Sequence, residues 1–187
     1  MHEKLFHLFI VSQDLSFFVH DHPEPAGPDA FRYHAKLPKP GMYRVLADYY
    51  PSNGTPQLTP RTIFVPGGDL RTPVLEPDLA SKHAANLDVE LITEPSQPIA
   101  GAKTLLFFRV KPGEGLEPYL GAWGRMLAAS DDLIDLIHTH PFLADGGPQI
   151  QFNLIFPRAR TYRMCVQFQR NGVVNTAVFT VPVTVLH

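Results

Sequence analysis

The sequence has very little cysteine and no long apolar run. Its 187 residues include a single cysteine, Cys165, so no disulfide can form within the chain, and we expect this thiol to be a small buried side chain. No apolar stretch reaches the roughly 18 residues of a membrane span. The N-terminus also lacks the basic start and the cleavage site of a signal peptide. The sequence therefore predicts a chain that is neither inserted in a membrane nor exported.

The chain is also poor in charge and in catalytic motifs. Charged residues make up 18% of it, with a net charge of −2 and no run of like charges, so we expect no nucleic-acid partner. The G-x-S-x-G, G-x-G-x-x-G and phosphate-loop motifs are missing as well. These absences favour a protein that is not an enzyme.

What the sequence does contain is proline, glycine and short β-prone segments. Its 19 prolines and 13 glycines predict many turns and few long helices. The segments between them are aromatic or β-branched, which is typical of strands. The expected strands are residues 4–11, 31–37, 42–50 and 61–65, then 87–93, 103–110 and 176–185.

Two parts of the chain resemble each other. Residues 7–23 align without a gap with residues 125–141, and residues 37–50 align with residues 156–169. A duplication explains this similarity most simply. We therefore predict an all-β protein with two immunoglobulin-like antiparallel β-sandwich domains. The predicted boundaries are an incomplete repeat 1 at 1–66, a linker at 67–85 and a complete repeat 2 at 86–187.

The first repeat is shorter than the second at its start. Residues 86–124 precede the shared part of repeat 2, whereas only residues 1–6 precede it in repeat 1. Repeat 1 is thus expected to lack two strands and to expose sheet edges and an apolar face. This predicts self-association through repeat 1, a protein partner that covers the gap, or a natural chain that extends upstream of Met1.

The motif His-x-His-Pro occurs twice, at residues 20–23 and 138–141. Side chains two residues apart project from the same face of a strand. If Gln13 and Asp14 form the tip of a tight hairpin, His7 lies directly opposite His20. His7, His20 and His22 would then form a ligand set for a transition metal, copper or zinc.

In the second repeat Arg125 takes the place of His7 and is expected to face His138. A guanidinium group stays protonated and cannot bind a metal. His138 and His140 therefore predict a weaker metal site, an empty one or one used by anions.

A structural interpretation of the same motifs is also open. Pro23 and Pro141 would end two strands in ordinary turns, with the imidazoles capping backbone groups. Tyr43 and Tyr162 are expected to be structural corner tyrosines. On this interpretation the protein is a metal-free interaction module. A third alternative is a cupin-like metalloenzyme, suggested by the sequence HDHPE, although Glu24 follows His22 too soon for that family.

The segments HEKLFHLFIVSQDLSFFVHDHPE, FPRARTYRMCVQFQRNGVVNTAVFTV and LEPYLGAWG resemble a bacterial family with tandem immunoglobulin-like domains. These proteins are grouped as YtkA-like or heavy-metal-associated extracytoplasmic proteins. The resemblance covers most of the chain and implies metal handling in a periplasmic or extracytoplasmic location, which conflicts with the missing signal peptide. Family members read Gly-His where this chain has Gly124-Arg125, which again sets the second histidine pair apart.

Overall fold

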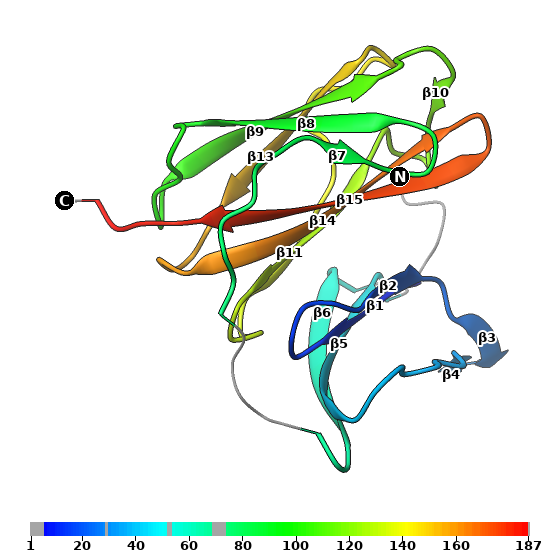
Figure 1. Ribbon diagram of the computed structural model, residues 1–187. Coiled ribbons are helices and arrows are strands. Elements are labelled where there is room, and N and C mark those ends of the chain that lie inside the picture. Colours follow the sequence, from blue (N-terminus) through cyan, green and yellow to red (C-terminus); the bar gives the residue numbers. More distant parts are fainter. Residues whose placement is uncertain (1–5, 29, 52–53, 69–73, 187) are drawn as a thin grey trace. The chain divides into compact units, whose positions relative to one another are not determined.

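The computed structural model describes residues 6–28, 30–51, 54–68 and 74–186 (Figure 1). These residues form strands, turns and loops, and the ladders between the strands are antiparallel, so the predicted all-β class is confirmed. None of the described residues forms a helix with the length and apolarity needed to span a membrane.

The chain divides into two compact units, Met1–Pro73 and Val74–His187. The expected linker at 67–85 is longer than the structure allows. Strand β7 (Lys82–His83) pairs with β8 (Asp88–Glu94), and Asp78 forms a β-bridge with Thr180. The stretch from Asp78 to His83 therefore belongs to the second unit.

The second unit is a β-sandwich, with its two sheets visible as layers in Figure 1. Phe108 shows how the layers meet, because its ring lies 5.4 Å from that of Phe152 in its own sheet and 5.7 Å from that of Phe168 in the other, between ring centroids. Alternate residues of the long strands are buried, as expected when one face of each sheet contributes to a shared core. One sheet has the order β13 (Gln149–Ile155), β9 (Lys103–Lys111), β8, β7; the other has the order β10 (Leu116–Glu117), β14 (Thr161–Arg170), β11 (Arg125–Ser130), β12 (Leu136–Thr139), with β15 (Val173–Pro182) also paired to β14.

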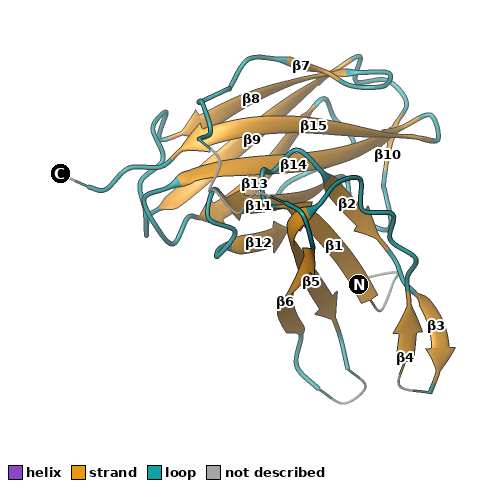
Figure 2. Ribbon diagram, turned by 60° about the horizontal axis from the view of Figure 1, so that its bottom comes forward, coloured by secondary structure: helices purple, strands orange, loops and turns teal. Residues whose placement is uncertain are grey.

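The described residues of the first unit form a four-stranded sheet and a separate two-stranded hairpin (Figure 2). The described part of this unit has no counterpart of β8 and β9. That this repeat is incomplete stays a prediction. One cluster of buried side chains in this unit, called the small core below, has Leu8, Ile10 and Tyr43 at its centre. The sheet has the order β2 (Phe18–Asp21), β1 (Phe6–Ser12), β5 (Gly41–Tyr49), β6 (Gln57–Val65), and the hairpin joins β3 (Glu24–Gly27) to β4 (Ala30–Arg32).

The strand expected at residues 31–37 is wrong for most of its length. Only its first two residues lie in a strand, β4, which pairs with β3. The equivalent segment of the second unit is β13, and β13 pairs with β9. Since the described part of the first unit has no counterpart of β9, a strand here would have no ladder partner for its backbone groups. Tyr33 and Leu37 pack instead against the small core.

The loop after the first shared strand has the same conformation in both units. In the first unit the Ser12 hydroxyl donates to Asp14 Oδ1 at 2.6 Å, and Leu15 has a φ of 56°. The second unit repeats this at Ser130, Asp132 and Leu133, with the same 2.6 Å and the same φ. Few non-glycine residues adopt this left-handed conformation, so the agreement is specific. The origin of the two units by duplication stays a prediction.

The two tyrosines predicted to be structural lie at corners of their sheets. The Tyr43 hydroxyl donates to the Lys39 carbonyl oxygen at 2.7 Å, and the Tyr162 hydroxyl lies 2.7 Å from Asp135 Oδ2 and 3.1 Å from the Arg158 carbonyl oxygen. Burial, together with the hydrogen bond to Asp135, raises the pKa of Tyr162. Both side chains thus connect a strand to the loop before it.

Candidate metal centre

The pairing of β1 with β2 differs from the expected hairpin. Phe9 lies opposite His20, and Leu8 lies opposite Asp21, so the prediction that His7 faces His20 is wrong. The Ser12 N–H donates to the Phe17 carbonyl oxygen at 3.1 Å. The loop therefore contains four residues, 13–16, instead of a two-residue tip at Gln13 and Asp14.

The three predicted ligands nevertheless lie on one face of the sheet. The register is shifted by two residues from the expected one, and a shift of two leaves every side chain on its original face. Continued by one position beyond the last pair, the same register brings His7 level with His22 instead of His20. The structure thus brings His7, His20 and His22 together through a different pairing.

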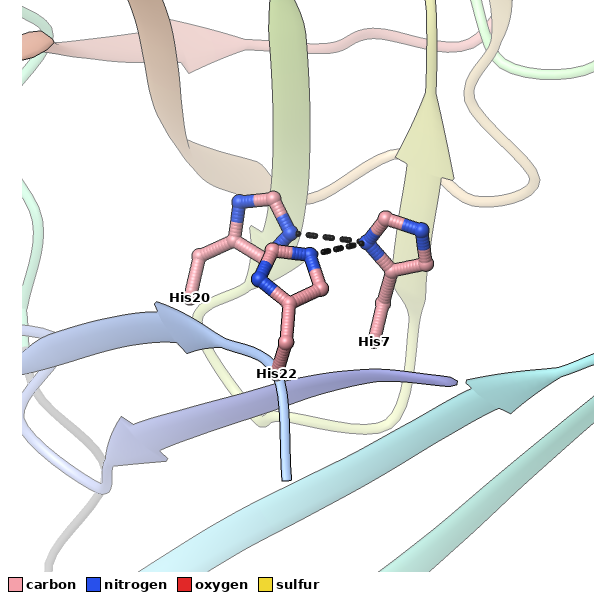
Figure 3. A group of neighbouring side chains, drawn as sticks. All are labelled: His7, His20 and His22. Atoms are coloured by element: carbon pink, nitrogen blue, oxygen red, sulfur yellow. Dashed lines mark hydrogen bonds between the residues drawn. The ribbon is translucent and has the colours of Figure 1, made fainter. Parts of the chain in front are cut away.

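The histidine cluster, His7 with His20 and His22, has three ring nitrogens that converge (Figure 3). His7 Nδ1 lies 3.2 Å from His20 Nε2 and 3.1 Å from His22 Nε2. One nitrogen from each ring lies within 4.8 Å of the others. His7 is buried, with 1% of its surface exposed, and the other two side chains are partly buried.

These distances suit a metal better than hydrogen bonding between the rings. A neutral imidazole has one nitrogen that donates and one that accepts. His7 Nδ1 is within reach of two other nitrogens but can make only one good hydrogen bond with them. A metal ion takes a lone pair from each ring, and tetrahedral bonds of about 2.0–2.1 Å place two donors about 3.3 Å apart. The two distances from His7 Nδ1 therefore match those expected around zinc, copper or another ion that prefers imidazole, and the cluster could hold such an ion.

The backbone around His22 is constrained on both sides. The His22 N–H donates to Asp21 Oδ1 at 2.8 Å. Pro23, which is buried, follows directly and restricts His22 to an extended conformation. Pro23 thus ends the strand, as expected, and also limits where the His22 ring can point.

The corresponding position in the second unit holds a guanidinium. Leu127 lies opposite His138, so the register brings Arg125 level with His140, and the expected pairing of Arg125 with His138 is wrong. Arg125 Nη1 lies 3.0 Å from His140 Nε2, and Nε donates to the Tyr119 carbonyl oxygen at 3.2 Å. The charged group thus contacts the histidine at the place where His7 contacts His22.

The second unit therefore lacks a ligand set like that of the first. The His138 and His140 rings are close, with centroids 4.6 Å apart. However, the only metal-compatible group of three His, Cys, Asp or Glu side chains among the described residues is the histidine cluster of the first unit. Arg125, which is 1% exposed, supplies a positive charge in place of a third ligand.

Two neighbours of the histidine cluster were not anticipated from the sequence. Phe9 lies opposite His20, and Asp48 of β5 lies opposite His7. Phe9 is two residues from His7, and this spacing indicates that both share a face. Asp48 could be found only from the pairing of β1 with β5, which the sequence pattern does not specify.

Comparison with protein families gives one finding. A family model described as Domain of unknown function (DUF8832) matches residues 1–67 and 82–185, and so covers all five histidines discussed above. No curated protein matches the chain. The resemblance to YtkA-like proteins stays a prediction.

Proposed function

The chain belongs to this family of domains of unknown function, and we propose that its first unit binds one transition-metal ion, zinc or copper, through His7, His20 and His22. The observation that carries the proposal is the position of His7 Nδ1, 3.2 Å and 3.1 Å from the two Nε2 atoms of the other rings. A single nitrogen cannot form good hydrogen bonds to both, whereas one ion can bind all three.

The origin of the ligands also supports this proposal. All three belong to one hairpin or its immediate end, and antiparallel backbone hydrogen bonds fix the spacing of β1 and β2. A ligand set held in this way needs little rearrangement to bind an ion, which favours affinity. The protein in this proposal holds the metal and catalyses no reaction. Its resemblance to extracytoplasmic metal-associated proteins suggests that it does so in the cell envelope.

A metal-free interaction module is the second candidate, favoured by the exposed strand β6. This strand lies at the edge of its sheet, and Leu58, Ile63 and Phe64 on it are exposed. The cupin-like alternative is not favoured, because a cupin needs both halves of the chain in one barrel and this chain forms two compact units.

Calorimetric titration of the protein without a histidine tag tests the proposal. Zn²⁺ or Cu²⁺ should bind to the parent protein, and His7→Ala, His20→Ala and His22→Ala should each abolish tight binding. His138→Ala is the matched control, because it removes the counterpart of His20 in the second unit, and it should bind like the parent. Absence of binding by the parent, or equal losses in His20→Ala and His138→Ala, would contradict the proposal.

A further inference from the structure

We infer that Phe9 is a positioning residue for the metal site. The Phe9 ring holds the imidazole of His20 in the plane in which His20 Nε2 points toward His7. The inference rests on the proposed function and adds to it the side chain that pre-forms the ligand set.

Phe9 and His20 form a close parallel stack. They are directly opposite each other in the pairing of β1 with β2. Their ring centroids lie 4.3 Å apart and their planes differ by only 13°. Phe9 is 1% exposed, so its own ring is held by its surroundings and can serve as a fixed surface.

Such a surface can fix the orientation of a histidine ligand, because the torsion of an imidazole ring is itself only weakly restricted. Rotation about the bond that joins an imidazole to its Cβ is broad and has no sharp minima. A turn of the His20 ring out of its present plane would bring the ring edge against the face of Phe9. The stack therefore restricts the ring to the orientation in which Nε2 lies 3.2 Å from His7 Nδ1.

The second unit supplies the natural comparison. There Leu127 lies opposite His138 and takes the place of Phe9. A leucine offers no flat face to an imidazole. Phe9→Leu thus gives the first unit the side chain that the second unit has, with little change in hydrophobicity.

The test measures Zn²⁺ affinity and the absorption spectrum of the Co²⁺-loaded protein in Phe9→Leu and Phe9→Met. The methionine keeps more of the phenylalanine side-chain volume but has no ring. Residues that orient a metal ligand typically contribute 10–100-fold to affinity. We therefore expect both variants to bind Zn²⁺ about 10–100-fold more weakly. We also expect the visible absorption bands of the Co²⁺-loaded variants to shift from those of the parent. Phe17→Leu is the control, because Phe17 packs on Tyr43 in the small core, at a centroid distance of 6.0 Å.

The possible outcomes separate this inference from the proposed function. Parent-like metal affinity and spectrum in whichever of the two Phe9 variants folds would overturn the inference. Equal losses of affinity in Phe9→Leu and Phe17→Leu would also overturn it, because they would indicate a general effect on stability. Failure of the parent to bind any metal would instead overturn the proposed function, and the inference with it. Weaker binding confined to the Phe9 variants supports the positioning role.

Discussion

At the scale of single residues, one position distinguishes the two histidine motifs. His7 supplies an imidazole nitrogen to the first, and Arg125 supplies a protonated guanidinium to the second, where its Nη1 lies 3.0 Å from His140 Nε2. A guanidinium contributes no lone pair and repels a cation beside it. In our account this residue is the reason why only the first unit binds a metal.

Arg125→His should therefore create a second metal site. The replacement places a third imidazole level with His140 and next to His138, on the pattern of the first unit, and removes the fixed positive charge. We expect the binding stoichiometry, measured by calorimetry or native mass spectrometry, to rise from one ion per chain to two. Arg125→Gln is the matched control, since it removes the charge without adding a ligand, and it should stay at one. Equal stoichiometry in the two variants would show that the second site fails for another reason.

Acidity should oppose metal binding in a defined direction. Histidine binds a metal only in its neutral form, and its ordinary pKa is about 6.5. Protons therefore compete with the ion as the pH falls, and three ligands make the loss of affinity steep. We expect tight binding at pH 7.5, much weaker binding at pH 5.5 and none at pH 4.5, as followed by calorimetry. Binding unchanged at pH 4.5 would mean that histidines are not the ligands.

At the scale of elements, ion pairs between side chains stabilise the loop between β11 and β12, and the first unit has only some of their counterparts. Arg158 lies 2.9 Å from both Asp132 Oδ2 and Asp135 Oδ2. The corresponding Lys39 of the first unit forms an ion pair with Asp14. Hydrogen bonds from Arg158 hold the pKa of Asp132 well below its ordinary value of 3.8. This loop should therefore contribute to stability in a pH-dependent way.

Asp132→Asn should destabilise the second unit most at neutral pH and progressively less as the pH falls below about 3.8. A carboxyl group with a lowered pKa in the folded state stabilises that state above its unfolded pKa, and the contribution is lost as the pH falls below about 3.8 toward the folded value. Hydrogen bonds to charged groups suggest a loss of about 1–3 kcal/mol at pH 7. Urea unfolding at pH 7 and pH 3 measures the difference between the parent and the variant. A stability difference of the same size at both pH values would contradict the claim that the lowered pKa of Asp132 stabilises the fold.

The elements themselves were largely predictable from the sequence, but their pairing was not. Alternating and β-branched residues predicted β1, β5, β8 and β9 because the period of two is a local property. The register of β1 with β2 depends on the loop, where Leu15 adopts a φ of 56°. A leucine in the sequence gives no indication of this left-handed conformation. The prediction that His7 shares a face with His20 and His22 stayed correct only because the register differs from the expected one by two residues, an even number.

The failed strand at residues 31–37 has a different cause. Its composition is that of a strand, yet a strand forms only where a neighbour can accept and donate its backbone hydrogen bonds. That neighbour in the second unit is β9, which lies far away in the sequence. The contact of Arg125 with His140 could not be predicted from the sequence either, because it depends on the register of β11 with β12.

At the scale of the whole molecule, the first unit presents an edge that invites association. Strand β6 pairs only with β5 among the described strands, and an unpaired edge offers its backbone groups to another chain. Three large apolar side chains on this strand, Leu58, Ile63 and Phe64, are exposed. Pro60 within the strand lacks an N–H and limits the length over which a partner could pair.

We predict that the protein forms a symmetric dimer through β6. Light scattering at micromolar concentration should give twice the mass of the chain, and Phe64→Lys should return it to a monomer by placing a charge in the contact. Ile134→Lys is the control, because Ile134 is an exposed apolar residue of the second unit, and it should leave the dimer intact. A monomeric parent protein with a folded first unit would contradict this prediction.

The most direct test of the central claim is the metal content of the whole protein. The parent chain, purified without a histidine tag, is loaded with Zn²⁺ or Cu²⁺, dialysed, and measured by elemental analysis and native mass spectrometry. The account predicts one tightly held ion per chain in the parent and in His138→Ala, and none in His7→Ala. A parent chain that retains no ion, or a His7→Ala chain that retains as much as the parent, would contradict the claim that the histidine cluster is a metal site.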